Sequence, residues 1–114
     1  MLQTLQKPWQ FRLVYRNGKK IDCKYAVLFY YRTGESADGP RFGVVASKRL
    51  GGAVKRNRAK RLLRETIGET SRRLIHNDLW IVLVARSGIT DIKRQEVQAD
   101  ISRKLENEGL CGRI

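Results

Sequence analysis

The feature that most constrains the fold is a continuous apolar run from Trp80 to Ala85, bounded by Asn77-Asp78 and by Ser87-Gly88. An apolar run of this length between turn-forming residues is typical of a strand whose two faces are both covered. We therefore expect a buried strand over residues 80–85, with other parts of the chain packed on both of its faces.

Two more strands are predicted upstream. The segment from Tyr25 to Arg32 is rich in aromatic and β-branched residues, which favour strands. Residues 33–40 contain two glycines and a proline, so we expect a turn or a hairpin loop there. A second strand is expected from Phe42 to Ser47, and Gly51-Gly52 breaks the chain after it.

Three segments have helical patterns. In residues 8–16 apolar side chains recur at helical spacing, Pro8 suits the first helical position, and Asn17-Gly18 provides a stop. Good helix formers dominate from Ala53 to about Ser71. From Asp91 to Glu108 apolar residues recur every four or five positions opposite charged ones, which predicts a terminal helix.

The resulting order of elements is helix, strand, strand, helix, strand, helix. This order predicts the α/β class, as a two-layer sandwich in which helices pack on a small mixed sheet. A chain of 114 residues has room for one core. We therefore expect a single domain over residues 1–114.

The charge balance indicates a polyanionic partner. Lys and Arg total 24 against 11 Asp and Glu, which gives a formal net charge of +13. So many like charges repel one another in a folded chain unless a polyanion is bound. Nucleic acid is the first candidate for that polyanion. The longest apolar runs, residues 26–31 and 79–85, are too short to span a membrane, and the first ten residues lack the pattern of a secretory signal. We expect a cytoplasmic protein with no membrane partner and no small-molecule substrate.

The two cysteines, Cys23 and Cys111, are isolated from each other and from the single histidine. Without a CxxC motif or a nearby histidine, a zinc site or a disulfide framework has little support. We expect free thiols that are buried or half-buried.

One segment carries most of the excess charge. Between Lys48 and Arg64 there are 8 Lys and Arg residues among 17, and no acid. A solvated helix face normally carries acids four positions from its bases, and like charges at that spacing destabilise an isolated helix. The pattern therefore favours nucleic-acid binding over a solvated face, although it does not separate RNA from DNA.

Helical projection divides this basic segment into two arcs. At about 100° per residue the apolar arc, which we expect to pack on the sheet, consists of Ala59, Leu62, Leu63, Thr66 and Ile67. A second arc holds Asn57, Lys60, Arg61 and Arg64, a row about 10 Å long that matches a few successive phosphates. Arg supplies a planar fork for phosphate, Lys a point charge, and Asn57 a donor and an acceptor for a base edge or a 2′-hydroxyl.

The basic segment also carries a specific motif. Residues 47–65, SKRLGGAVKRNRAKRLLRE, resemble the signature of the protein subunit of bacterial ribonuclease P, with Arg56-Asn57-Arg58 as its RNR core. The resemblance extends to FRLVYRNG at residues 11–18, to FGVV at residues 42–45 and to DLWIV at residues 78–82. It covers nearly the whole chain.

The resemblance implies a fold, a reaction and partners. The fold is similar to the second domain of ribosomal protein S5, with a left-handed βαβ crossover. The reaction is removal of the 5′ leader from precursor tRNA by a large RNA subunit with bound Mg²⁺. The partners are that RNA subunit and the precursor tRNA. The protein then assists the cleavage, provides no catalytic residue, and is expected to bind no metal itself.

The resemblance also assigns residues to the two RNA partners. The residues implied to contact the RNA subunit are Lys48, Arg49, Arg56, Asn57, Arg58, Lys60, Arg61 and Arg64. Those implied to bind the leader, in a cleft between the sheet and the first helix, are Phe11, Tyr15 and Phe29, because unpaired bases stack on aromatic rings. Aromatic residues at such spacings are often core instead, so both interpretations stay open. Gly68 departs from the family pattern and is expected to shorten or bend the basic helix.

Two other classes of protein compete with this interpretation. A self-sufficient nuclease needs paired carboxylates for metals or two histidines for acid and base catalysis, whereas His76 is the only histidine and the 11 acids form no tight cluster. A structural RNA-binding module, such as a ribosomal-protein-like assembly factor, shares the expected fold class and charge. Only the signature and the aromatic residues argue against it.

Overall fold

A mixed sheet of five strands forms the centre of the structure, a computed structural model that describes residues 3–35 and 39–112. In spatial order the strands are β1 (Gln3–Thr4), β4 (Arg41–Val45), β5 (Leu79–Ala85), β3 (Ala26–Arg32) and β2 (Lys19–Asp22). The three α-helices are α1 (Pro8–Asn17), α2 (Ala53–Thr70) and α3 (Arg94–Asn107), and short 3-10 turns occupy Lys48–Leu50 (η1), Ser71–Arg73 (η2) and Ile89–Asp91 (η3). The predicted α/β class with a small mixed sheet is confirmed.

Strand β5 takes the central position that its apolar sequence requires. It pairs in parallel with β4 on one side and antiparallel with β3 on the other. Strands β3 and β4 are consecutive in the chain but are not neighbours in the sheet. The hairpin considered for residues 33–40 is therefore wrong, because β5 inserts between the two strands that it would have joined.

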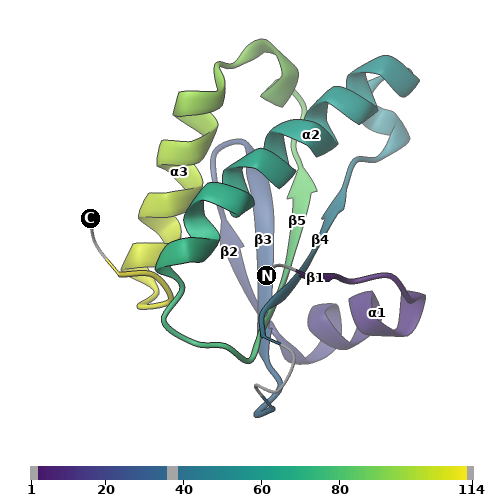
Figure 1. Cartoon of the computed structure of the whole chain (residues 1–114). Helices are drawn as coiled ribbons and strands as arrows, with labels where there is room; N and C mark the ends of the chain where they lie inside the picture. Colours follow the sequence, from purple (N-terminus) through teal and green to yellow (C-terminus); the bar gives the residue numbers. More distant parts are fainter. Residues whose placement is uncertain (1–2, 36–38, 113–114) are drawn as a thin grey trace.

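The helices cover the two faces of the sheet unequally (Figure 1). Helices α2 and α3 lie together on one face, and the shorter α1 crosses the lower part of the other face. In this view β4 and β5 run upward with β5 on the left, and α2 connects them in front of the sheet. This β4-α2-β5 connection is left-handed, as the family resemblance implied and against the general preference for right-handed crossovers.

The side chains of β5 alternate between the two faces of the sheet and pack into two separate cores. Ile81 and Leu83 point toward α2 and α3 and belong to the larger cluster, together with Leu63, Ile67 and other fully buried residues. Val82 points to the opposite face, where it packs with Val14 of α1 and with Leu5. Both faces of β5 are thus covered, which confirms the expectation for this strand.

The element boundaries differ from the predicted ones at several ends. The terminal helix begins at Arg94 rather than at Asp91, because residues 89–91 form η3 and Ile92 is extended. Helix α2 continues through Gly68 to Thr70, so Gly68 does not shorten it. Two edge strands, β1 and β2, were not predicted.

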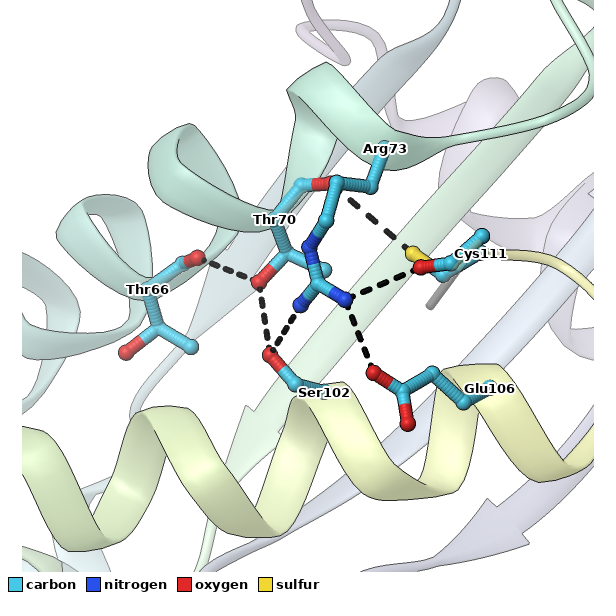
Figure 2. Close-up of polar contacts among 7 residues, drawn as sticks. Thr66, Thr70, Arg73, Ser102, Glu106 and Cys111 are labelled. Carbon is cyan, nitrogen blue, oxygen red and sulfur yellow. Dashed lines mark hydrogen bonds and ion pairs between the residues drawn. The ribbon is translucent and has the colours of Figure 1, made fainter. Parts of the chain in front are cut away.

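A buried polar network fastens the end of α2 to α3 (Figure 2). The Thr70 hydroxyl donates to the Thr66 carbonyl at 2.8 Å and lies 3.3 Å from the Ser102 hydroxyl. The Arg73 guanidinium donates to Ser102 at 3.0 Å, to Glu106 at 2.8 Å and to the Gly112 carbonyl at 3.0 Å. The network holds the last turn of α2, α3 and the C-terminal residues of the described chain in one arrangement.

Both thiols are free and buried, as predicted. Burial raises the pKa of Cys23 to about 12, with a further contribution from the nearby Asp100 carboxylate. Burial also raises the pKa of Cys111, whose thiol donates to the Thr70 carbonyl at 3.8 Å. Neither group is a thiolate near neutral pH, so neither is a reactive nucleophile.

A buried carboxylate, Asp78, joins the start of β5 to the end of β3. It accepts hydrogen bonds from Arg32 Nε at 3.2 Å and from the Gly34 N–H at 3.1 Å. Burial alone would raise the pKa of this carboxyl, but the bonds from Arg32 and Gly34 outweigh it and lower the pKa below its ordinary value. The ionised form is therefore the one that the fold stabilises.

This lowered pKa predicts an acid-dependent loss of stability. The contribution of Asp78 is present above the pKa of an unfolded Asp, about 4, and is lost as the pH falls from there through the lower folded pKa. We expect Asp78→Asn to reduce the urea midpoint at pH 7 and to reduce it much less near pH 2. Asp22→Asn is the control, because that carboxylate is exposed and its surface ion pair with Arg86 contributes little. An equal deficit at both pH values would contradict the prediction.

Candidate nucleic-acid interface

Helix α2 lies with its apolar arc on the sheet and its basic residues toward solvent. Ala59, Leu63, Thr66 and Ile67 are fully buried, and Leu62 is half-buried against the same core. This confirms the predicted apolar arc. Burial of one side fixes the rotation of the helix about its axis, so the side chains on the other side form a surface in a defined orientation.

The residues that form the basic surface come from η1 and α2. Lys48, Arg49, Asn57, Arg58, Arg61 and Arg64 are exposed, whereas Lys60 and Arg56 are half-buried. Among residues 3–35 and 39–112, none of these cationic side chains forms an ion pair, and the nearest acid on the helix, Glu65, pairs with Arg94 at 3.5 Å. The positive charge on this surface is thus uncompensated by the protein's own described acids.

Arg56 differs from its neighbours in its surroundings. Its side chain is half-buried, and its Nε is buried with no hydrogen-bond partner. Arg56 therefore lies at the boundary between the basic surface and the packed part of the molecule.

The turn before α2 leaves the helix start open. Gly51 adopts φ +130°, a conformation that side-chain-bearing residues rarely take, and Gly52 precedes the first helical residue without a side-chain cap. The first turn of α2 contains no acid. Backbone N–H groups at such a helix start favour an anion, which adds to the attraction of the basic residues.

The three aromatic residues predicted for the leader lie on the face of the sheet that α1 crosses. The Tyr15 and Phe29 rings meet edge to face with centroids 4.9 Å apart, and Tyr15 is 39% exposed. Phe11 is half-buried against Gly43, where an added Cβ would come within 2.5 Å of the Phe11 ring. Phe11 and Phe29 thus have packing roles, and Tyr15 presents the accessible ring.

The basic and aromatic surfaces meet at the edge of the sheet. Arg64 of α2 and Phe11 of α1 line the same pocket, which has a volume of about 350 Å³ and lies beside β1 and β4. Residues from the two separately predicted sets are therefore brought together by the fold. Tyr15 and Phe29 do not line this pocket.

Among the exposed apolar residues, one on α1 and one on α2 were not predicted from the sequence. Trp9 on α1 is 53% exposed and Val54 on the first turn of α2 is 84% exposed. The sequence contained a signal for the exposure of Trp9. Val14 follows it by five residues, which places the two side chains about 140° apart around the helix axis. Since Val14 is fully buried, Trp9 cannot share its face.

Within residues 3–35 and 39–112, no three His, Cys, Asp or Glu side chains lie close enough to hold a metal ion. No helix of the described chain is long and apolar enough to cross a membrane. His76, the only histidine, lies half-buried in the turn before β5.

The left-handed α/β fold, the uncompensated basic helix and the exposed aromatic ring are features that suit a nucleic-acid ligand. Comparison with known sequences then gives the family of this chain. The sequence model of the Ribonuclease P family matches residues 2–108, and the chain belongs to this family. The family resemblance of the signature is thereby confirmed.

Relatives and solved structures agree with this assignment. The chain is 34% identical over 112 residues to the ribonuclease P protein component of Fusobacterium nucleatum, covering 96% of this chain and 99% of the relative. It is 31% identical to that of Clostridium novyi, covering 95% of each chain. The Staphylococcus aureus RNase P protein superimposes with a TM-score of 0.81 at 25% identity, covering 96% of this chain and 97% of the other. The RNase P protein from Thermotoga maritima has the same fold, with a TM-score of 0.77.

Proposed function

We propose that this chain binds the catalytic RNA subunit of ribonuclease P through η1 and α2, and the 5′ leader of precursor tRNA through its aromatic surface. The observation that carries the proposal is the exposed side of α2, where Asn57, Arg61 and Arg64 lie without acidic partners. Membership of the Ribonuclease P family implies an RNA partner and a role in tRNA processing.

The basic surface suits a folded RNA because it is long and fixed in orientation. Successive turns of α2 present donors to the same side, and the buried arc on Leu63 and Ile67 prevents the helix from rotating. Phosphates bound along such a row release counterions, so binding weakens steeply as salt is added. Asn57 adds one group that can donate to and accept from a 2′-hydroxyl, which DNA lacks.

The aromatic surface suits an unpaired strand. A base can stack on the exposed ring of Tyr15, which the edge-to-face contact with Phe29 holds in place. Stacking requires a base outside a helix, and a 5′ leader supplies such bases, while the 5′ end of a mature tRNA is paired and does not. This surface therefore gives the protein a means of favouring substrate over product.

Mg²⁺ does not fit the residues of the basic surface. Mg²⁺ prefers oxygen ligands, usually carboxylates, whereas the basic surface contains no acid between Lys48 and Arg64. We infer that the metal of the holoenzyme is held by the RNA subunit and that this chain lowers the repulsion between the two RNAs.

The test is cleavage of precursor tRNA by the cognate RNA subunit at a Mg²⁺ concentration too low for the RNA alone. The protein should restore cleavage at the mature 5′ end, because its cations replace part of the screening that Mg²⁺ provides. An unrelated basic protein of similar charge is the control. If both proteins act alike, or neither acts, the chain is a general RNA-binding module instead.

The protein without RNA is expected to have no nuclease activity. The described chain offers no cluster of acids for metal ions and has one histidine, so it lacks the groups that protein ribonucleases use. Precursor tRNA should remain intact after prolonged incubation with protein and Mg²⁺. Multiple turnover at the mature 5′ end by RNA-free protein would contradict this prediction.

A further inference from the structure

Trp9 is the most exposed aromatic residue of the described chain, and the functions proposed above do not use it. It lies in the first turn of α1, is 53% exposed, and its ring centroid lies 6.0 Å from that of Trp80 with the planes tilted by 54°. Trp80 is half-buried on β5. Trp80 thus packs against one side of the Trp9 ring, and about half of the Trp9 surface stays accessible.

Cationic residues flank this ring. Arg12 and Arg16 lie three and seven positions after Trp9, so all three occupy the outer side of α1. Both arginines are exposed, and neither forms an ion pair within residues 3–35 and 39–112. Helix α1 contains no acid at all. An exposed indole beside two unpaired guanidinium groups is complementary to a strand with bases and phosphates.

This surface is distinct from the aromatic surface at Tyr15. Six residues separate Trp9 from Tyr15, which places them about 120° apart around α1 and about 9 Å apart along its axis. Tyr15 contacts Phe29, whereas Trp9 contacts Trp80. A strand that stacks on Tyr15 can reach Trp9 by continuing over the outer side of the helix.

We propose that Trp9, Arg12 and Arg16 bind unpaired RNA nucleotides of the leader, farther upstream than those at Tyr15. The proposal rests on the proposed function, because it extends the same leader across α1. A protein partner fits less well, since stable protein interfaces bury about 800 Å² on each side around an apolar centre. Here one indole is flanked by charged residues, and the adjacent Leu13 is already half-buried.

The first experiment varies the length of the leader. Holoenzymes with wild-type protein or Trp9→Ala are compared in binding precursor tRNAs with a leader of a few nucleotides and with a leader several times longer. We expect Trp9→Ala to weaken binding of the long-leader substrate by about 5- to 10-fold, the effect of losing one stacked base, and to leave the short-leader substrate unchanged. Trp9→Phe, which keeps a ring, should recover most of the loss.

Matched controls separate stacking from general effects. Ile75→Ala removes another exposed apolar side chain, 58% exposed and remote from α1 in sequence, and should change neither affinity. Arg12→Ala should weaken the long-leader complex and Arg103→Ala should not, although each removes one exposed arginine.

The second experiment reports on Trp9 directly. The chain has 2 tryptophans, so Trp80→Phe leaves Trp9 as the only indole. Stacking of a base should quench its fluorescence when the holoenzyme binds long-leader precursor, and mature tRNA should cause little quenching. Equal quenching by both RNAs would overturn the proposal.

Other outcomes would also overturn it. A loss of equal size for both leaders, or a lower melting temperature of the free protein without leader dependence, would make Trp9 a packing residue that covers Trp80. Self-association of the free protein that Trp9→Ala abolishes would make the surface a contact between copies. If Tyr15→Ala reduces discrimination while Trp9→Ala does nothing, this inference fails and the proposed function stands.

Discussion

Replacing both Arg61 and Arg64 with alanine is expected to weaken binding of the RNA subunit on the order of 100-fold at moderate salt. The two side chains lie one turn apart on the exposed side of α2, and neither forms an ion pair with a described residue. Two lost contacts to charged groups, at about 1.5 kcal/mol each, correspond to a loss of that size. The slope of log K against log salt should also become shallower by about 1.4–1.8.

The control for this prediction is a second double variant with the same net charge as the first. Arg72→Ala with Arg103→Ala also removes two exposed arginines, from η2 and from α3, so long-range electrostatic attraction falls by the same amount. This second double variant should retain nearly wild-type affinity and salt slope. If the two double variants behaved alike, the RNA would be responding to total charge, and α2 would not be its specific contact. Circular dichroism checks that both variants fold.

Replacing Tyr15 with alanine is expected to cost about 1–2 kcal/mol in affinity for precursor tRNA and almost nothing for mature tRNA. The reason is that the exposed ring offers a stacking surface that only unpaired leader bases can use. Burial raises the pKa of the Tyr15 hydroxyl, so this group stays neutral near pH 7 and adds no charge that would repel phosphate.

The measurement is binding of precursor and mature tRNA to holoenzymes that contain either form of the protein. Phe29→Ala is an informative comparison, because Phe29 is half-buried beneath Tyr15 and its loss should also lower the melting temperature of the free protein. Equal losses for both RNAs with Tyr15→Ala would return this residue to a packing role.

Much of the secondary structure could be predicted from local patterns. The helical arc that contains Leu63 and Ile67 and the apolar run before Ala85 are each strong because burial imposes one periodicity over many residues. The two edge strands were missed for a physical reason. In β2 only Ile21 is buried, and β1 has two exposed residues. Pairing with β3 and β4 makes these segments strands, and such pairing leaves no periodic pattern in so few residues.

Strand order and exposure were beyond local patterns for a different reason. The insertion of β5 between β3 and β4 brings together segments that are far apart in the chain. The sequence of each strand does not indicate which strand lies beside it. For the candidate site, the signature at Arg56-Asn57-Arg58 and the helical projection of α2 were informative because they depend on sequence alone. Whether Phe11 or Tyr15 is accessible depends on what packs against each ring, such as the approach of Gly43 to Phe11.

The two edge strands have a mechanical consequence for α1. The helix is preceded by β1 at one edge of the sheet and followed by β2 at the other, so both of its ends are anchored while it spans the strands between them (Figure 1). Helix α1, anchored at both ends, cannot move away from the sheet without detaching an edge strand. The backbone positions from which its rings project are therefore fixed in the free protein, so binding does not have to order the helix. The leader binding that we propose should accordingly proceed without a slow conformational step, at a rate set by encounter and electrostatic attraction.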